Sequence, residues 1–164
     1  MATSYFVNQS MVGVDLMNGN ATALFAVGTH VNGTNNSEWV YVQAATSVNA
    51  YTVCAFNSAT FTCGMASGGD LSLGANLAVA QTSISAQAYG WVATRGVGLQ
   101  VSQTGISSAG STVYLAASAA PTGSISTSIS ASNTVQGIAV EASTSATYAY
   151  VNLSWPRGMV TTGL

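Results

Sequence analysis

Few side chains in this sequence have the type and spacing that a catalytic site requires. His30 is the only histidine, and it follows the apolar segment 24–28 with no recognisable nucleophile motif beside it. A Ser–His–Asp or Cys–His site would have to use this residue. The four carboxylates, at positions 15, 38, 70 and 141, are too scattered to predict an acid–base pair of the kind a glycosidase uses. We therefore expect no catalytic residues and no enzymatic activity.

Metal and cofactor sites are not indicated either. One histidine and two cysteines, Cys54 and Cys63, match no zinc-binding spacing. Asp70 follows two glycines but lacks the dense acidic spacing of an EF-hand loop. The glycine-rich segment 64–69 has neither the Lys-Ser/Thr pair of a P-loop nor the glycine spacing of a dinucleotide fingerprint. The sequence predicts no metal and no cofactor.

The two cysteines lie in a nearly symmetric segment, residues 51–63, which predicts a β-hairpin. A two-residue turn at positions 58–59 would bring the cysteines to opposite, non-hydrogen-bonded positions on one face. A disulfide is then geometrically allowed, but free thiols packed in a core are the favoured alternative in a reducing compartment. The predicted cross-strand pairs are Phe56 with Phe61 and Cys54 with Cys63.

The low charge content narrows the class of protein. Charged residues make up 4% of the chain, against about 25% in a typical soluble protein. A membrane span is not indicated because the uncharged stretch 96–140 is interrupted throughout by Ser, Thr, Gly and Gln. Disorder is not indicated because 9% of the residues are aromatic and the net charge is only −2. The remaining explanation for the low charge content is a surface that is buried in an assembly.

The same composition bears on partners and compartment. No strong basic patch exists, so nucleic-acid binding has no electrostatic source. Residues 1–30 contain no Lys or Arg and no clean apolar run, so we expect no secretory signal and folding in a cytoplasm.

The chain contains two cationic side chains, Arg95 and Arg157, and no lysine. Because an unpaired buried charge is costly, each arginine could meet a carboxylate of its own chain or of a neighbour. Alternatively, each could be an exposed charge at the end of a strand. The sequence leaves both alternatives open.

The elements that would position these residues are short strands. Alternating apolar and polar residues, separated by turn signals and without a convincing helix, predict about ten strands, no domain linker and no evident internal repeat. We expect a single all-β domain over residues 24–164, an antiparallel β-sandwich or barrel, preceded by an extended N-terminal arm over residues 1–23. The predicted strands lie at 24–28, 38–44, the two arms of the cysteine hairpin, 76–84, 89–95, 97–101, 112–116, 124–130, 134–141 and 147–155. In 124–130 we expect the serines to point outward.

The last predicted strand carries several large side chains. Strict alternation would place Leu153 and Trp155 on one face and Tyr148 and Tyr150 on the other. Pro156 is expected to end the strand.

Short aromatic and glycine landmarks along most of the chain resemble those of small structural proteins of tailed bacteriophages. The similarity is to capsid decoration (cement) proteins and related β proteins encoded near the major capsid gene. The residues that carry it lie at 25–29, 38–44, 89–92, 95–96, 135–138 and 155–157.

The resemblance implies a non-enzymatic β-barrel or β-sandwich protein of the virion. Such proteins are assembled in the host bacterial cytoplasm, bind the outer face of an icosahedral capsid as dimers or trimers, and clamp neighbouring major capsid subunits. It implies no active site, and it supplies no contact residues. From the sequence of the chain itself, we expect no role for nucleic acid or membrane, and the candidate interface residues are Tyr5, Phe6, Val7, Arg95, Tyr148, Tyr150 and Arg157.

Two alternatives remain beside this expectation. The chain could be a phage tail or head-fibre component, which copy number and symmetry would distinguish. It could also be a secreted adhesin or carbohydrate-binding module, in which exposed aromatics stack on sugar rings. The aromatic pairs considered for that role are Trp39 with Tyr41 and Tyr148 with Tyr150.

Overall fold

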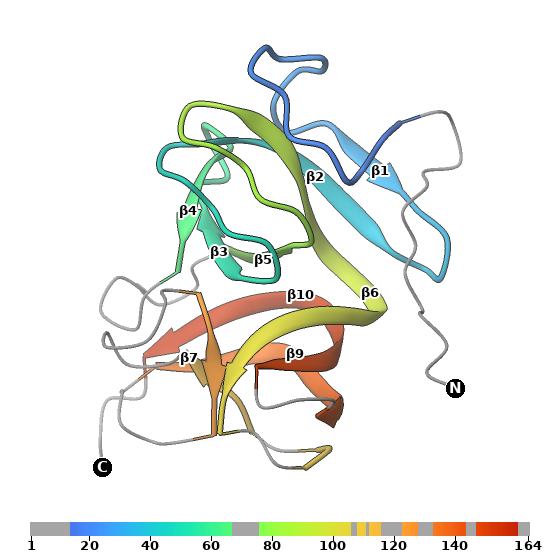
Figure 1. Cartoon of the computed structure of the whole chain (residues 1–164), viewed down its shortest axis with the longest axis vertical. Helices are drawn as coiled ribbons and strands as arrows, with labels where there is room; N and C mark the ends of the chain where they lie inside the picture. The colour runs from blue at the N-terminus through green and yellow to red at the C-terminus, as the bar shows by residue number, and fades with distance from the viewer. Residues whose placement is uncertain are drawn as a thin grey trace.

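The computed structural model is an all-β protein (Figure 1). It describes residues 14–66, 76–105, 108–110, 112–115, 123–127, 133–143 and 147–160. Within these ranges the chain forms ten strands and no helix, which confirms the all-β part of the prediction. The predicted interface residues Tyr5, Phe6 and Val7 lie outside the described residues.

All ten strands belong to one sheet, and the longest lies near the middle of the chain. Their bounds are β1 (His30–Asn32), β2 (Glu38–Ala44), β3 (Val53–Phe56), β4 (Thr62–Met65), β5 (Asn76–Ala80), β6 (Tyr89–Thr104), β7 (Tyr114–Leu115), β8 (Ile125–Ser126), β9 (Asn133–Ser143) and β10 (Tyr148–Val160). β2 has the predicted bounds, since its aromatic and β-branched residues alternate over its whole length.

Five strands of the first half pair in a closed ring. β2 pairs with β6, β6 with β5, β5 with β3, β3 with β4, and β4 with β2. The β2–β4 pair is parallel and the others are antiparallel, so the prediction of a purely antiparallel sheet is wrong. β1 extends the ring by pairing with the first half of β2.

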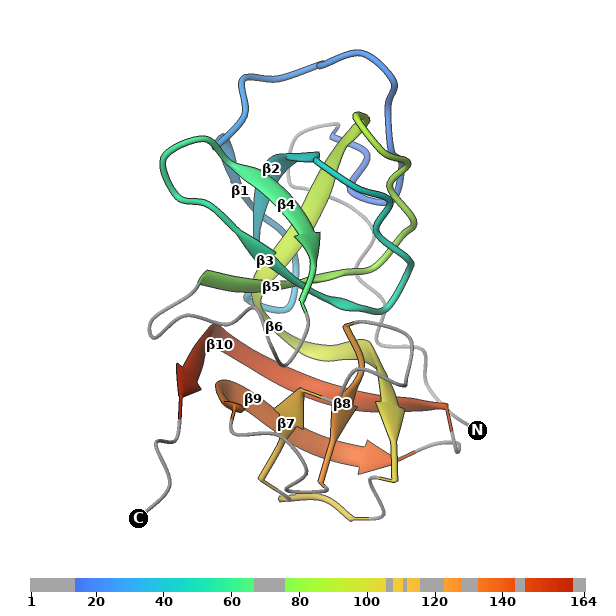
Figure 2. The same ribbon diagram turned by 90° about the vertical axis from the view of Figure 1, so that its left-hand side faces the viewer.

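Five strands of the second half form another ring, and β6 belongs to both. β6 pairs with β8, β8 with β7, β7 with β9, β9 with β10, and β10 with β6. Figure 2 shows β6 running from the upper group of strands into the lower one. A single pair, Arg157 opposite Asn76, also joins β10 to β5 where the rings meet.

The two rings repeat one order of pairing. Within each ring the strands can be counted in chain order from one to five. The first strand pairs in parallel with the third, the second pairs with the third and the fourth, and the fifth pairs with the first. Strands β2–β6 thus correspond to β6–β10, with a period of about 60 residues. Arg95 and Gly96 lie in β6, and Arg157 and Gly158 lie in the corresponding strand β10. The sequence alone does not reveal this repeat because few residues are identical.

Two apolar clusters fill the rings. The first takes alternate side chains from all five strands of the first ring, among them Val40, Val42, Cys54, Cys63, Ala78 and Val92. The second fills the other ring and continues to the opposite face of β2 and β6, where Trp39, Tyr41 and Trp91 are buried. β2 is therefore buried on both faces, and it separates the two clusters.

Residues 24–28 do not form the predicted strand. The segment's only backbone hydrogen bond to β2 joins Gly28 N to Tyr41 O (2.7 Å), and Leu24 N donates to the Tyr41 hydroxyl at 3.1 Å. Gly28 has a φ of 84° that ends extended pairing. Leu24 is 63% exposed, whereas Phe25 packs on Tyr41 and Trp91. His30, expected in a loop, is an exposed residue of the edge strand β1.

The cysteine hairpin forms, but with another register than predicted. Cys63 lies opposite Phe56, and Cys54 lies opposite Met65. The side chain of Asn57 accepts hydrogen bonds from the backbone of residues 59 and 60, which builds a longer loop. Ser58 and Ala59 are not residues that favour a two-residue turn, so the predicted tight hairpin is less stable than the longer loop. The thiols are free, as favoured.

The serines in β8 and directly before it do not point outward as predicted. Ser124 and Ser126 are buried, like Ile125 between them. The segment lies against the first ring, where Val53 N donates to Gly123 O at 2.7 Å. Contact between the rings therefore covers the face that the alternation predicted to be in solvent.

Candidate interaction site around Trp155

A large bulge interrupts β10 near its end. Leu153 lies opposite Ile138 of β9, and the next pair joins Arg157 with Gln136, so residues 154–156 all face Gly137. The strand continues beyond Pro156, which contradicts the prediction that this proline ends it. A proline is tolerated here because the bulge requires no ladder hydrogen bond from it.

The bulge turns Trp155 away from the core. Trp155 is 50% exposed, whereas the alternation predicted it on the apolar face with Leu153, which is buried. Its φ of 44° lies in the left-handed region, which costs a residue with a side chain about 1–2 kcal/mol. Bulky residues in this region are outliers that concentrate at functional sites.

Arg95 holds the exposed indole from one side. Its guanidinium carbon lies 5.0 Å from the centroid of the Trp155 ring, within cation–π range. Arg95 Nη1 also donates to Glu38 Oε1 at 3.0 Å, and both side chains are about a quarter to a third exposed. The backbone carbonyl of Glu38 accepts a hydrogen bond from Thr94 Oγ1. β2, β6 and β10 together therefore fix the orientation of this arginine.

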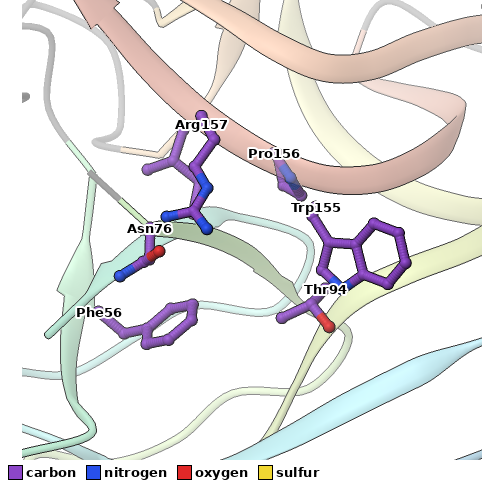
Figure 3. A pocket seen from close by; sticks show the side chains of 7 residues that line it. Phe56, Asn76, Thr94, Trp155, Pro156 and Arg157 are labelled. Carbon is purple, nitrogen blue, oxygen red and sulfur yellow. The ribbon is translucent and has the colours of Figure 1, made fainter. Parts of the chain in front are cut away.

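A small pocket lies beside Trp155, where the two rings meet (Figure 3). Its volume is about 40 Å³, little more than one water occupies in the liquid. A small-molecule site needs about 300–1,000 Å³. The residues that line it are Phe56, Asn76, Leu77, Thr94, Trp155, Pro156 and Arg157. The pocket can accept part of one side chain of a partner, but not a substrate.

Both arginines of the chain border Trp155. Arg95 contacts the indole directly, and Arg157, which is exposed, lines the adjoining pocket. Figure 3 shows the Arg157 side chain directed toward Asn76, with the indole on the other side of the pocket. The sequence left open whether each arginine pairs with a carboxylate or is an exposed charge at a strand end. Arg95 pairs with Glu38, a carboxylate of its own chain.

The other predicted interface residues lie elsewhere on β10. Tyr148 is 36% exposed and meets the ring of Tyr51 edge-on at 5.3 Å. The Tyr150 hydroxyl accepts a hydrogen bond from Gln100 Nε2 at 3.1 Å. The structure thus brings the two arginines together at the bulge, and it places the tyrosines near the start of the strand.

Trp39 and Tyr41 cannot stack on a sugar, because both are fully buried. Trp155 is the exposed tryptophan that the sequence reading assigned to the core. The one local signal was the Trp-Pro-Arg sequence at 155–157, since a proline in a strand marks an edge or a bulge.

The backbone strain at Trp155 predicts an unusual order of stabilities. In a regular strand, glycine is less stable than alanine by about 0.5–1 kcal/mol. At φ 44° the order should reverse, and Trp155→Gly should exceed Trp155→Ala in free energy of unfolding by about 1 kcal/mol. Urea unfolding followed by circular dichroism measures both. Tyr148, exposed to a similar degree on the same strand but without a positive φ, is the control and should show the ordinary order.

The remaining reactive side chains are dispersed. Asp15 accepts hydrogen bonds from Met17 N and Asn18 Nδ2, and Glu141 accepts one from Asn152 Nδ2 at 2.8 Å. Asp70 lies outside the described residues. Among the residues that the structure describes, no group of three potential metal ligands is found.

The cysteines form a coupled buried pair in the first ring. A hydrogen bond from Cys54 lowers the pKa of the Cys63 thiol. The same bond, together with burial, raises the pKa of Cys54 well above its usual value. The Cys54 thiol also contacts the carbonyl of Ala78, and both side chains belong to the apolar cluster, so this pair is part of the core.

In the described part of the chain, no helix is long and apolar enough to cross a membrane. The sequence matches no known protein family, and no curated protein matches it.

Proposed function

We propose that this protein is a structural component of a phage virion, which binds the outer surface of an icosahedral capsid and clamps neighbouring major capsid subunits. The observation that carries the proposal is Trp155, an exposed and strained tryptophan held by an arginine on a nearly uncharged β body. Tryptophan and arginine dominate the residues that carry binding energy at protein interfaces. The site thus supports attachment to another protein.

The size of the pocket and the dispersal of ionisable groups favour binding over catalysis in this proposal. A cavity of about 40 Å³ leaves room for one anchoring group. The described carboxylates Asp15, Glu38 and Glu141 each have separate partners. In this proposal the protein needs no cofactor or metal and does not bind nucleic acid or a membrane. Its partners are the major capsid protein and further copies of itself in a dimer or trimer.

For the architecture, we propose that each ring of strands is a small closed barrel, which gives two barrels joined through β6. The complete cycle of pairings in each ring and the apolar cluster inside each support this arrangement over an open sandwich. Residues 1–23 would be an arm that reaches a neighbouring subunit. Its root would be Leu16, which is fully buried, and Asn20, which bridges to Tyr89.

Binding to capsid shells tests the proposal. The full-length protein is mixed with shells purified from cells that lack it, sedimented, and quantified at increasing concentration. We expect saturable binding at a fixed number of copies per shell, and a discrete dimer or trimer by light scattering of the free protein. A monomer that does not sediment with the shells would contradict the proposal.

A second candidate is a carbohydrate-binding module, and Trp155 is the observation in its favour. Half of its surface is exposed, and one face of an indole can stack on a pyranose ring. On a glycan array the wild type should then bind defined saccharides and Trp155→Ala should not. No binding by the wild type excludes this candidate.

A further inference from the structure

We infer that Asn18 is a site of spontaneous covalent modification, where deamidation gives aspartate and isoaspartate and loosens the attachment of residues 16–20 to β6. The inference does not depend on the proposed capsid function. It is carried by a contrast between the two Asn-Gly pairs of the sequence, Asn18-Gly19 and Asn32-Gly33. The structure leaves the first pair open to the reaction and protects the second.

The reaction needs only water and groups of the chain itself. The Gly19 backbone nitrogen attacks Cγ of Asn18, the bond from Cγ to Nδ2 breaks, and the amide nitrogen leaves as ammonia with the proton of the attacking nitrogen. Water then opens the cyclic imide. Opening at Cγ gives aspartate, whereas opening at the main-chain carbonyl gives isoaspartate, whose main chain is longer by one carbon. One water is consumed, one ammonia is released, and nothing is oxidised or reduced.

The first Asn-Gly pair is accessible to this attack. Asn18 and Gly19 are both exposed, and glycine has no side chain to hinder the attacking nitrogen. The Gly19 N–H donates to no acceptor in the described part of the chain. The Asn18 amide is restrained by one exposed contact, from Nδ2 to Asp15 Oδ2. Because water competes for an exposed hydrogen bond, this contact restrains the side chain only weakly.

The second pair is protected by the β1–β2 hairpin. Asn32 is the last residue of β1, and Gly33 N donates to Ser37 O at 2.8 Å. Ser37 is itself buried, and its hydroxyl accepts a hydrogen bond from Trp39 Nε1 at 3.0 Å. Attack by the Gly33 nitrogen therefore requires that this end of the hairpin opens first.

The reactive pair lies between two fixed points of the chain. Leu16 is fully buried, and Asn20 exchanges two backbone hydrogen bonds of 2.8 Å with Tyr89, the first residue of β6. Between them the chain runs close to other backbone, since a Cβ at Gly19 would lie 3.3 Å from Ser83 O. An additional main-chain carbon changes the spacing of the two fixed points, so isoaspartate should weaken the bridge from Asn20 to Tyr89.

The test begins with the folded, full-length protein incubated at mildly alkaline pH. Mass spectrometry of chymotryptic peptides follows each site separately, isoaspartyl methyltransferase detects isoaspartate, and fresh protein gives the deamidation that occurs during digestion. We expect Asn18 to react about five to ten times faster than Asn32, the factor that one hydrogen bond of typical net strength gives. In urea, where both pairs lose their structure, the two rates should become similar.

Hydrogen exchange of the Asn20 and Tyr89 amides measures the loosening. In incubated wild type these amides should exchange at least about fivefold faster, while the Gly33 amide is unchanged. Asn18→Gln should keep its protection after the same incubation, because glutamine forms the cyclic imide far more slowly. Freshly prepared Asn18→Asp should also keep it, because it carries the new charge without the additional main-chain carbon.

The outcomes decide both parts of the inference. If Asn32 reacts as fast as Asn18 in the folded protein, or if Asn18 reacts only in urea, the assignment of the site is wrong. If isoaspartate forms at Asn18 and the Tyr89 amide keeps its protection, the loosening is wrong. If fresh Asn18→Asp exchanges as fast as incubated wild type, the charge is responsible, and the role of the longer main chain is overturned.

Discussion

Trp91→Ala is expected to lower the free energy of unfolding by about 3–5 kcal/mol, the usual cost of removing a buried tryptophan. Trp91 lies on β6, the strand shared by both rings, and is 1% exposed. Its ring centroid lies 4.9 Å from that of Tyr41 and 5.4 Å from that of Phe25. Since small domains are stable by only about 5–15 kcal/mol, this loss should leave little of the native state at elevated temperature.

Urea unfolding followed by far-ultraviolet circular dichroism measures this effect without relying on tryptophan fluorescence. Phe25→Ala is the matched control, because Phe25 belongs to the same aromatic cluster, packing on Tyr41 and Trp91, but is 36% exposed. We expect it to cost about 1–2 kcal/mol, in proportion to its smaller burial. An equal loss in both variants would show that Trp91 is not the centre of this cluster.

The sequence predicts those elements whose signals are local. The alternation in residues 38–44 predicts β2 with its observed bounds, because both faces of that strand are packed and each needs its own set of apolar side chains. The all-β class and the free thiols are likewise predicted. In each case the neighbours in sequence contain most of the information.

The sequence fails where a distant residue decides the outcome. Apart from Pro156, the residues near Trp155 in the chain do not indicate its exposure, since the bulge lies opposite Gly137 in β9. The closure of each ring depends on the short parallel pairs β2–β4 and β6–β8, which join strands that are not consecutive. The hairpin register depends on a hydrogen bond that the Asn57 side chain accepts from the backbone of Ala59, and alternation does not encode this bond.

The repeat of the two rings explains one further feature of the sequence. Arg95 and Arg157 occupy corresponding strands, yet they meet at one site because β10 lies against β6 in an antiparallel pair. Ser154 is opposite Arg95, so the end of β10 that carries Arg157 lies beside the middle of β6 that carries Arg95. The second ring repeats the strand pattern of the first, and the cationic side chains of the two rings therefore lie on one surface.

Gly137→Ala is expected to destabilise the protein and to abolish the presentation of Trp155. Gly137 has a φ of 79°, and a Cβ there would lie 2.5 Å from Ser154 O and 3.0 Å from Pro156 Cα. Both contacts are with backbone, which cannot rotate away as a side chain can. Strain in the left-handed region costs about 1–2 kcal/mol, and displacement of the bulge should bring the total to about 3–4 kcal/mol, within the range of severe single substitutions.

Gly105→Ala separates the steric clash of the added methyl group from the backbone strain of a positive φ. Gly105 has nearly the same conformation, with a φ of 73°, but a Cβ there meets no atom of the described residues within 4 Å. It should therefore lose only about 1–2 kcal/mol, and the difference between the two variants in urea unfolding measures the clash with the bulge. Gly137→Ala should also weaken shell binding under conditions in which it remains folded, whereas Gly105→Ala should not. Equal losses of stability, with binding intact in both, would mean that β10 accommodates the methyl group, and that Trp155 keeps its place without the open space at Gly137.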